Sequence, residues 1–262
     1  MLKNECWLLI QNECLLRKKS AELPIFTIEE MNYFQHVLSN QQQLLIENQT
    51  IIFCGSVEKN FLPPDFVEAI PLKKAFAELD LYWQTLTSKA RTILNWNKTH
   101  QYCGHCGQPT IQPNLTIFER VCSQCGLTFY PRISPSIIVR IQKNDSILMA
   151  RSYHFPKGVY GLIAGFVEVG ETLEEAVYRE VKEETNLEIN NLCYYGSQFW
   201  PFPDSLMIAF TADYAKGELV FDKKEIEDGD WYRYDQMPGK PSSSVSISRK
   251  LIEDFINQQT LR

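Results

Sequence analysis

Short apolar runs separated by polar linkers predict strands in the first third of the chain. The runs are residues 6–11, 43–47 and 50–57. After Pro63-Pro64 the apolar residues recur every three or four positions, which is the period of a helix. These positions are Leu72, Phe76, Leu79, Trp83, Leu86, Ala90, Ile93 and Leu94. We interpret this stripe as a packing face, either for the core of a domain or for a dimer.

From Pro131 onward, the pattern predicts a domain that mixes strands and helices. Two apolar runs flank Lys143-Asn144-Asp145, and turn residues in that position predict a hairpin. Further apolar runs predict strands at residues 160–171, 193–200, 205–214 and 218–221. One helix after Thr172 and a final helix near residues 246–258 complete the pattern. The predicted fold class is therefore α+β.

Composition narrows the class of protein. The chain has 262 residues, of which 44% are hydrophobic and 22% charged, and this balance excludes global disorder. No run approaches the roughly 18 apolar residues of a membrane span. The apolar stretch at the N-terminus is interrupted by Glu5 and Glu13 and lacks a small-residue cleavage site, which argues against a signal peptide. A net charge of −6 disfavours an overall basic surface for nucleic acids.

Four of the eight cysteines form two pairs with the spacing of a metal site. Cys103 and Cys106 make one Cys-x-x-Cys knuckle, Cys122 and Cys125 make the other, and a glycine follows each. Four thiolates close a tetrahedral site without an open position, so we predict structural zinc. His105 lies inside the first knuckle, but four sulfur atoms already suffice.

The remaining cysteines are scattered, and we interpret them as small buried hydrophobic residues. They are Cys6, Cys14, Cys54 and Cys193. A disulfide scaffold belongs to short secreted chains, and this chain is neither short nor visibly secreted. A cytoplasmic location fits this use of cysteine better.

A glutamate-rich segment carries the clearest chemical signal. Residues 168–184 contain seven glutamates and only two basic residues. Thr172 and Glu175 have the Ser/Thr-x-x-Glu form of a capping box, which predicts a helix that starts at Leu173.

Three of these glutamates, Glu180, Glu183 and Glu184, leave the same side of the predicted helix, where like charges repel. Two interpretations stay open at this point. The carboxylates bind a hard divalent cation such as Mg²⁺, or they form a solvated acidic face with Arg179 as salt-bridge partner.

The spacing of the segment resembles the Nudix box. Gly165 is followed after five residues by Glu171 and after seven more by Arg179-Glu180-Val181-x-Glu183-Glu184, with Leu187 at the end. Nudix hydrolases cleave nucleoside diphosphates linked to another moiety, and divalent cations on the Glu-rich helix assist them. The resemblance implies their fold, a mixed sheet sandwiched between helices.

One position departs from the Nudix box, because Asn186 stands where the pattern has glycine. That glycine ends the helix in a left-handed conformation. Asparagine is the second-best residue for this conformation, so we expect the helix end to survive.

A second motif follows the box at residues 197–205, Ser-Gln-Phe-Trp-Pro-Phe-Pro-Asp-Ser. We predict a short loop whose aromatic residues and prolines make a rigid surface. Flat bases such as adenine or nicotinamide stack on such a surface. Judged alone, an apolar loop plugged into the core is the alternative.

The ribbon, the box and this motif together resemble the NADH pyrophosphatase (NudC-type) family. Its members have an N-terminal domain, a four-cysteine zinc ribbon and a Nudix domain, which divides this chain at 1–97, 98–130 and 131–262. They hydrolyse NADH and NAD⁺ to nicotinamide mononucleotide and AMP, and they remove NAD caps from RNA 5′ ends. They act as homodimers.

The resemblance also assigns roles to single residues. It implies that Glu180, Glu184, Glu225 and the backbone carbonyl of Ala164 hold Mg²⁺ or Mn²⁺. Glu183 would be the general base, so the expected catalytic residues are Glu180, Glu183 and Glu184. The expected substrate contacts are Tyr130, Gln198, Phe199, Trp200, Pro201, Phe202, Pro203, Asp204, Ser205 and Ser248.

Two of these contacts depart from the family. Phe199 stands where the family often has proline, and Ser248 stands where alanine is usual. Two other functions also stay open, namely a different Nudix specificity such as ADP-ribose, and an inert dinucleotide- or RNA-binding regulator. Inert relatives usually lose box carboxylates, whereas this chain retains them.

Overall fold

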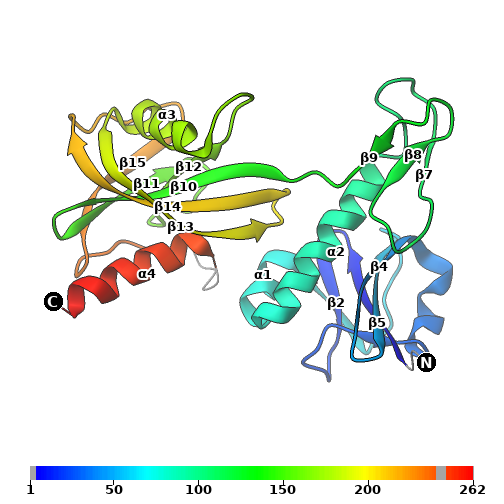
Figure 1. Cartoon of the computed structure of the whole chain (residues 1–262). Coiled ribbons are helices and arrows are strands. Elements are labelled where there is room, and N and C mark those ends of the chain that lie inside the picture. The colour runs from blue at the N-terminus through cyan, green and yellow to red at the C-terminus, as the bar shows by residue number, and fades with distance from the viewer. Residues whose placement is uncertain (1–3, 240–245, 262) are drawn as a thin grey trace. The chain divides into compact units, whose positions relative to one another are not determined.

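The computed structural model describes residues 4–239 and 246–261, and the chain divides into two compact units (Figure 1). The first unit is Met1–Arg132 and the second is Ile133–Arg262. Among the described residues, no helix is both long enough and apolar enough to cross a membrane.

A mixed sheet forms the base of the first unit, with strand order β4-β5-β1-β2-β6 and with β3 paired to β1. β1 and β5 run parallel, and the other neighbours run antiparallel. The three predicted apolar runs lie within β1, β4 and β5, which confirms them as strands. The elements are β1 (Asn4–Gln11), β2 (Cys14–Lys18), β3 (Phe26–Thr27), the 3₁₀ turns η1 (Glu30–Tyr33) and η2 (Gln35–Val37), β4 (Leu38–Glu47), β5 (Thr50–Val57) and β6 (Val67–Pro71).

The predicted helical stripe forms two helices, α1 (Leu72–Glu78) and α2 (Leu81–Thr99). The break has a local cause, because the carboxylate of Asp80 accepts a hydrogen bond from Trp83 N at 3.0 Å and caps the start of α2. The apolar positions of the stripe are buried, as a packing face requires. The sequence pattern therefore located the packing face but missed the break.

Three very short strands follow α2 and form the ribbon. They are β7 (Thr110–Ile111), β8 (Arg120–Cys122) and β9 (Thr128–Phe129), and they pair antiparallel in this order. Strands of two or three residues bury very little apolar surface, so the cysteine knuckles between them must supply the stability of the ribbon.

The second unit contains a mixed sheet of order β13-β14-β10-β11-β15, with β12 paired to β10. β10 runs parallel to β14 and antiparallel to its other partners, and the predicted hairpin joins β10 and β11. The strands are β10 (Ser134–Lys143), β11 (Ser146–Ser152), β12 (Ile163–Phe166), β13 (Glu188–Trp200), β14 (Ser205–Lys216) and β15 (Ile226–Arg233). The helices are α3 (Leu173–Thr185) and α4 (Ile247–Thr260).

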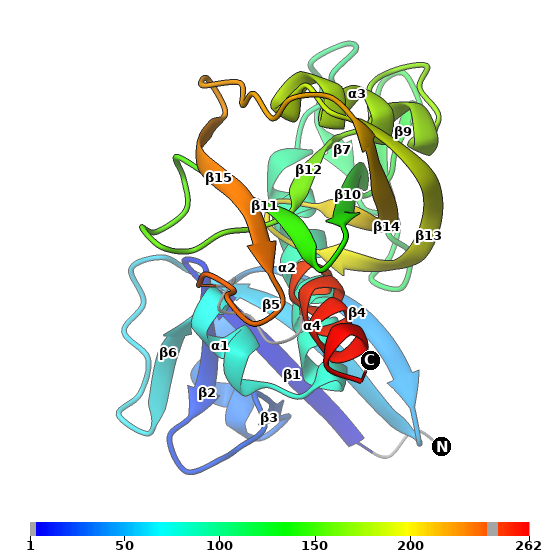
Figure 2. The same cartoon turned by 90° about the vertical axis from the view of Figure 1, so that its left-hand side faces the viewer.

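The two helices of the second unit cover opposite faces of its sheet (Figures 1 and 2). Along β10, Ile137 and Val139 pack with α3, whereas Ile138 packs with α4. This alternation follows from the two-residue period of a strand. The expected sheet between helices is confirmed.

Three sequence expectations for the second unit were wrong. Cys193 is exposed and not a small buried residue. Residues 218–221 form no strand, because the chain there bonds to the end of α3 instead of to a sheet. Residues 197–205 are not one loop either. Residues 197–200 end β13, Ser205 starts β14, and only the four residues between them form the turn.

Candidate active site and zinc centre

The Glu-rich helix α3 starts where the capping box predicts. Thr172 Oγ1 accepts a hydrogen bond from Glu175 N at 3.2 Å, and the Glu175 carboxylate accepts one from Thr172 N at 2.8 Å. Both bonds satisfy N–H groups that the first turn of a helix leaves unpaired. Ala176, Val177 and Val181 face the core, so the rotation of α3 about its axis is set.

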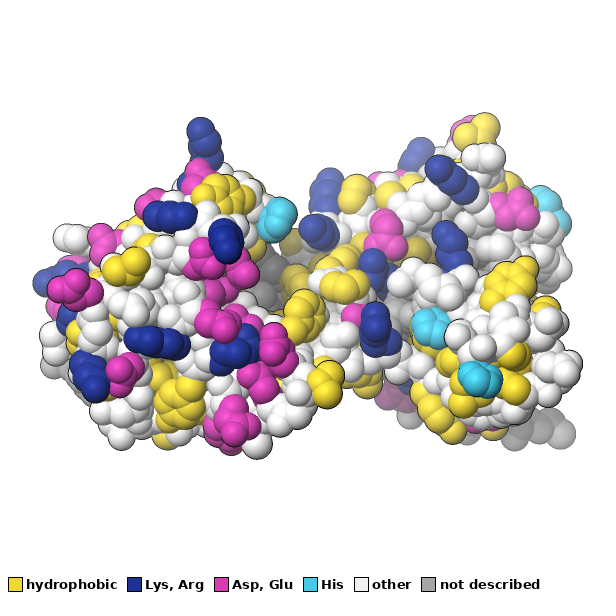
Figure 3. All heavy atoms as spheres, turned by 90° about the horizontal axis from the view of Figure 1, so that it is seen from above, with side chains coloured by type: hydrophobic (Ala, Val, Ile, Leu, Met, Phe, Trp, Pro, Cys, Tyr) yellow, Lys and Arg dark blue, Asp and Glu magenta, His cyan; other side chains and the backbone are white. Residues whose placement is uncertain are grey.

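That rotation buries two of the three clustered glutamates. Glu180 and Glu184 are 9% and 6% exposed, whereas the Glu183 side chain is 59% exposed. Figure 3 views the molecule from the side of α3 and shows acidic side chains interspersed with basic ones on this face of the second unit. The two buried residues and the exposed one therefore have different environments.

Burial raises the pKa of Glu184 to about 8, and the negative charges of Glu180 and Glu225 add to the effect. The pKa of Glu180 is also raised, mainly by burial, although Arg179 opposes that shift. Such groups resist ionisation unless positive charge compensates them. This face of α3 therefore favours a bound cation.

Arg179 uses all five of its N–H donors on this face. Its Nε and Nη2 donate to the two carboxylate oxygens of Glu171 at 2.5 and 2.9 Å. Its Nη1 donates to Glu180 at 2.9 Å and to Glu183 at 3.1 Å. A last bond joins Nη2 to the carbonyl of Phe166 at 3.0 Å.

These bonds lower the pKa of Glu171 to about 2, mainly through the hydrogen bonds from Arg179, and they raise the pKa of Arg179. Arg179 thus holds the carboxylates of α3 in one arrangement.

Gly165 leaves the space that the Glu180 carboxylate occupies. A Cβ atom at residue 165 would lie 1.9 Å from Glu180 Oε1 and 2.0 Å from its carboxyl carbon. Gly165 and Ala164 belong to β12, where they pair with Ile137 and Ile138 of β10. The lack of a side chain at Gly165 allows the strand and the Glu180 carboxylate to approach each other this closely.

Glu225 reaches the same place from a distant part of the sequence. The carboxyl group of Glu225 is close enough to that of Glu184 to help raise its pKa. Residues 217–225, called the 217–225 segment below, precede β15 and bond to the end of α3. Val220 N donates to Thr185 O at 3.1 Å, and Asp222 N donates to Glu184 O at 3.0 Å.

The donor set fits Mg²⁺ or Mn²⁺, since both prefer carboxylate oxygen. Within the described residues, only the four cysteines already have their ligand atoms within 4.8 Å of one another. The carboxylates of Glu180, Glu184 and Glu225 are neighbours that would have to converge further to hold a cation.

The aromatic motif lies beside the box through the start of β10. Ser134 pairs with Ser205 of β14, and Ser136 pairs with Phe166 at the end of β12. Since neighbouring strands lie about 4.8 Å apart, the tip of the β13–β14 hairpin and the end of β12 are on the order of 10 Å apart.

The hairpin tip is ordered by its own contacts. The rings of Trp200 and Phe202 meet edge to face at 5.6 Å, and Pro201 is buried. The Asp204 carbonyl and carboxylate accept bonds from Ser134 at 2.9 and 3.1 Å. Phe199 pairs with Leu206 in the strand ladder, and Pro203 is exposed at the turn. The motif is thus partly buried and partly presented to solvent.

Helix α4 begins next to this hairpin. The side-chain carbonyl of Gln198 accepts a hydrogen bond from Ile247 N at 2.7 Å, and Ser246 caps the helix. The expected contact Ser248 lies in the first turn of α4 and therefore close to Gln198. Tyr130 belongs to the first unit, where it is 65% exposed.

Sequence analysis did not single out Phe166. It directly follows Gly165, its side chain is 54% exposed, and its carbonyl bonds to Arg179. The sequence does show an aromatic residue next to the glycine of the box. However, its exposure could not be predicted, because it depends on where the apolar strand β12 ends.

The four cysteines of the ribbon converge as predicted. Sγ–Sγ distances are 3.7 Å for Cys103–Cys125, 3.4 Å for Cys106–Cys122 and 3.7 Å for Cys106–Cys125. A tetrahedron with Zn–S bonds of about 2.3 Å has edges of about 3.8 Å, so the sulfur cluster fits zinc. Hydrogen bonds from the N–H groups of Cys125 and Gln124 lower the pKa of Cys122 to about 6.

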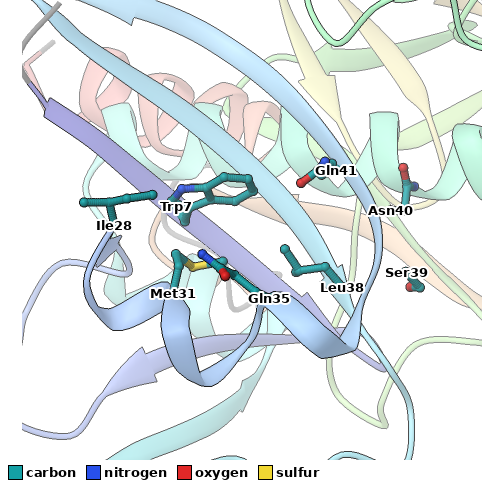
Figure 4. Close-up of a pocket in the computed structure, with 8 residues that line it drawn as sticks. All are labelled: Trp7, Ile28, Met31, Gln35, Leu38, Ser39, Asn40 and Gln41. Atoms are coloured by element: carbon teal, nitrogen blue, oxygen red, sulfur yellow. The ribbon is translucent and has the colours of Figure 1, made fainter.

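Two hollows of the first unit lack such chemistry. One of about 420 Å³ lies beside Trp7 and is otherwise lined by uncharged residues (Figure 4). The other, of about 680 Å³, borders α2 and is lined by both acidic and basic side chains, including an ion pair between Glu13 and Arg91. Neither gathers carboxylates or thiols in the manner of α3 and the ribbon.

The close approach of Gly165 and Glu180 predicts the effect of a methyl group there. Gly165→Ala should displace the Glu180 carboxylate and weaken Mn²⁺ binding about tenfold or more, as loss of ligand orientation does. Titration of Mn²⁺ followed by electron paramagnetic resonance measures this. Gly196→Ala is the matched control, because its Cβ would meet only Ile247 Cδ1, at 3.9 Å. Unchanged affinity in Gly165→Ala would contradict the geometry.

The raised pKa of Glu184 predicts a pH-dependent stability in protein freed of Mg²⁺ and Mn²⁺ by gel filtration. The stabilising contribution of protonated Glu184 is full below its ordinary pKa of 4.5 and is lost as the pH rises through about 8. Glu184→Gln keeps a neutral side chain, so its free energy of unfolding should gain on the wild type between about pH 5 and about pH 9, by on the order of 1–3 kcal/mol.

Urea unfolding at both pH values measures this gain. Glu174→Gln, at an exposed position of the same helix, should show no comparable change. A pH-independent difference between Glu184→Gln and wild type would mean that Glu184 ionises normally.

Comparisons with known proteins agree with the geometry. A family model described as NUDIX domain matches residues 131–255, and one described as NADH pyrophosphatase zinc ribbon domain matches residues 98–130. A Nudix hydrolase structure from Nitrosomonas europaea superposes with a TM-score of 0.52 at 18% identity, over 62% of this chain and 93% of that one. This likeness shows the fold alone.

Curated relatives match about two thirds of the chain. The protein named NAD-capped RNA hydrolase NudC of Salmonella heidelberg (strain SL476) is 47% identical over 171 residues, which are 65% of this chain and 66% of the relative. The one of Klebsiella pneumoniae (strain 342) matches with the same identity and coverage. The match spans just under two thirds of these relatives. The chain belongs to the NADH pyrophosphatase (NudC-type) family of Nudix hydrolases with a four-cysteine zinc ribbon.

Proposed function

We propose that this protein hydrolyses the pyrophosphate bond of NADH and NAD⁺ to nicotinamide mononucleotide and AMP, and that it removes NAD caps from RNA 5′ ends. The observation that carries the proposal is the burial of Glu180 and Glu184 beside Glu225. Buried like charges need compensating positive charge, and a bridging pyrophosphate needs the same. The names of the curated relatives support this substrate class.

Mg²⁺ or Mn²⁺ would be held by Glu180, Glu184, Glu225 and the carbonyl of Ala164. A divalent cation, when bound, lowers the pKa of water and neutralises charge on the phosphate oxygens. The protein's own part is to present these oxygens together. Arg179 and Gly165 do so for Glu180, and the 217–225 segment does so for Glu225.

Glu183 is the proposed general base. Its side chain is exposed and differs in this from the two buried glutamates, so water reaches it. A carboxylate in this place accepts the proton of the water molecule that attacks phosphorus, and the phosphate on the other side of the bridge leaves. Arg179 Nη1 donates a hydrogen bond to the Glu183 carboxylate. Because all five N–H groups of Arg179 are used within the protein, it would donate none to the substrate.

Substrate recognition is assigned to the hairpin tip and the residues around it. The bases would stack on the exposed ring of Phe166 and on the partly exposed rings of Trp200 and Phe202. Gln198, Phe199, Pro201, Pro203, Asp204 and Ser205 would shape that surface, and Ser248 and Tyr130 would contribute from α4 and the first unit. We further propose that the protein is cytoplasmic and forms a homodimer. The catalytic cation would be Mg²⁺ or Mn²⁺, and the zinc of the ribbon would be structural.

The central test is hydrolysis of NADH, ADP-ribose and NAD-capped RNA at matched concentrations, with Mg²⁺ or Mn²⁺ and with excess chelator. NADH and NAD-capped RNA should be cleaved, and chelator should abolish cleavage. Glu183→Gln should lower kcat by about 10²–10⁴, the usual contribution of a positioned base, while folding stays near normal.

Glu174→Gln on the same helix is the control and should retain activity. Full turnover by Glu183→Gln would remove Glu183 from the mechanism. Faster cleavage of ADP-ribose than of NADH would indicate another Nudix specificity, and no metal-dependent cleavage of any substrate would indicate a binding protein.

A second prediction separates recognition from chemistry. Trp200→Ala should raise KM for NADH about tenfold, the value of one stacked base, with a smaller change for a pyrophosphate that lacks nicotinamide. Steady-state kinetics on both substrates measures the split. Tyr194→Ala, which removes an exposed aromatic side chain elsewhere on β13, is the control. Equal losses on the two substrates would make the motif merely structural.

A further inference from the structure

We infer that Asn186 is a positioning residue whose side-chain amide fixes the 217–225 segment, and with it Glu225, against the end of α3. The inference rests on the proposed function, because that function assigns Glu225 to the cation site. Asn186 is also the position at which this chain departs from the Nudix box.

The backbone of Asn186 does what the glycine of the box would do. Its φ of 59° is left-handed, and its N–H donates to Lys182 O at 3.0 Å, which closes the helix. Glycine satisfies this conformation at least as well as asparagine. The cap alone therefore does not explain what an amide side chain contributes here.

The side chain adds two bonds that glycine lacks. Asn186 Oδ1 accepts from Lys182 Nζ at 2.9 Å, and Asn186 Nδ2 donates to the backbone carbonyl of Glu218 at 3.3 Å. The first bond orients the amide on the helix. The second joins the helix end to the 217–225 segment.

The Glu218 bond is the first of a ladder that leads toward Glu225. Three successive residues at the end of α3 bond to alternate residues of the segment, in the pairs Asn186–Glu218, Thr185–Val220 and Glu184–Asp222. The carbonyl of Asp222 then accepts bonds from Glu225 N at 3.1 Å and Ile226 N at 2.9 Å. This turn sets Glu225 beside Glu184 and starts β15.

Gly217 allows the segment to approach the helix end. Its φ is 113°, and a Cβ there would lie 3.0 Å from Asn186 O and 3.2 Å from Leu187 Cα. The ladder is therefore tight at the end where Asn186 holds it. Because backbone bonds supply the two later rungs, the amide is the only side-chain rung of the three pairs named above.

The test is Mn²⁺ binding, followed by electron paramagnetic resonance, in wild type and Asn186→Gly. The variant keeps the left-handed cap and loses the Glu218 rung, so Kd for Mn²⁺ should rise about five- to tenfold, the value of one ordinary hydrogen bond. At saturating Mn²⁺, kcat and the KM for NADH should return to wild-type values, and thermal stability should be unchanged or higher.

Two further variants give the comparison its meaning. Asn144→Gly makes the same change at another left-handed position (φ 55°), in the β10–β11 turn, and should leave Mn²⁺ affinity unchanged. Gly217→Ala pushes the segment away from Asn186 and should weaken Mn²⁺ binding as well. Because both changes break the same contact, the double variant should lose less than the sum of the two single losses.

The outcomes separate this inference from the proposed function. Mn²⁺ affinity of Asn186→Gly within about twofold of wild type would overturn the inference, since an ordinary hydrogen bond is worth more than that. The same result would not contradict the proposed hydrolysis by the wild type. Weakened Mn²⁺ binding in a protein that cleaves none of the three substrates would support the positioning role and overturn the proposed function. No Mn²⁺ binding by wild type would overturn both.

Discussion

Two carboxylates of one helix, held together away from water, are the constraint on which the second unit depends. Burial and mutual repulsion both oppose the ionised forms of Glu180 and Glu184. The packing of α3 on the sheet must therefore contribute enough stability to offset the cost of burying Glu180 and Glu184. The apolar face of α3, the capping box and the sheet beneath supply that stability, so the helix cannot turn its glutamates toward solvent without exposing Ala176, Val177 and Val181.

The parts of the fold that sequence reasoning predicted well depend on local chemistry. The start of α3 follows from Thr172 and Glu175, its end follows from the tolerance of Asn186 for a left-handed conformation, and the cysteine spacing alone predicts the sulfur cluster. Local rules also explain the errors. Residues 218–221 have the composition of a strand, but Val220 N donates to the carbonyl of Thr185 at the end of α3, which no pattern within the run reveals.

The site itself was harder to predict because its members are distant in sequence. Glu225 meets Glu184 through a ladder between the end of the Nudix box and a segment that carries no motif, 217–225. The hairpin tip lies beside β12 only because both strands pair with the first residues of β10. Charge shows a similar division. Residues 1–132 contain equal numbers of acidic and basic side chains, so the net charge of −6 belongs to residues 133–262. The net charge of the whole chain does not show that the excess of acidic residues is confined to the second unit.

The saturation of Arg179 would impose an order of binding on the proposed hydrolysis. Every N–H of its guanidinium donates to Glu171, Glu180, Glu183 or the carbonyl of Phe166. None is therefore left to donate a hydrogen bond to a phosphate. Under the proposed function, an anionic dinucleotide would meet the carboxylates of α3 with no free donor of Arg179 to offset their charge. In the proposed reaction a divalent cation would therefore bind before the dinucleotide, and the concentration of free divalent ions would limit turnover.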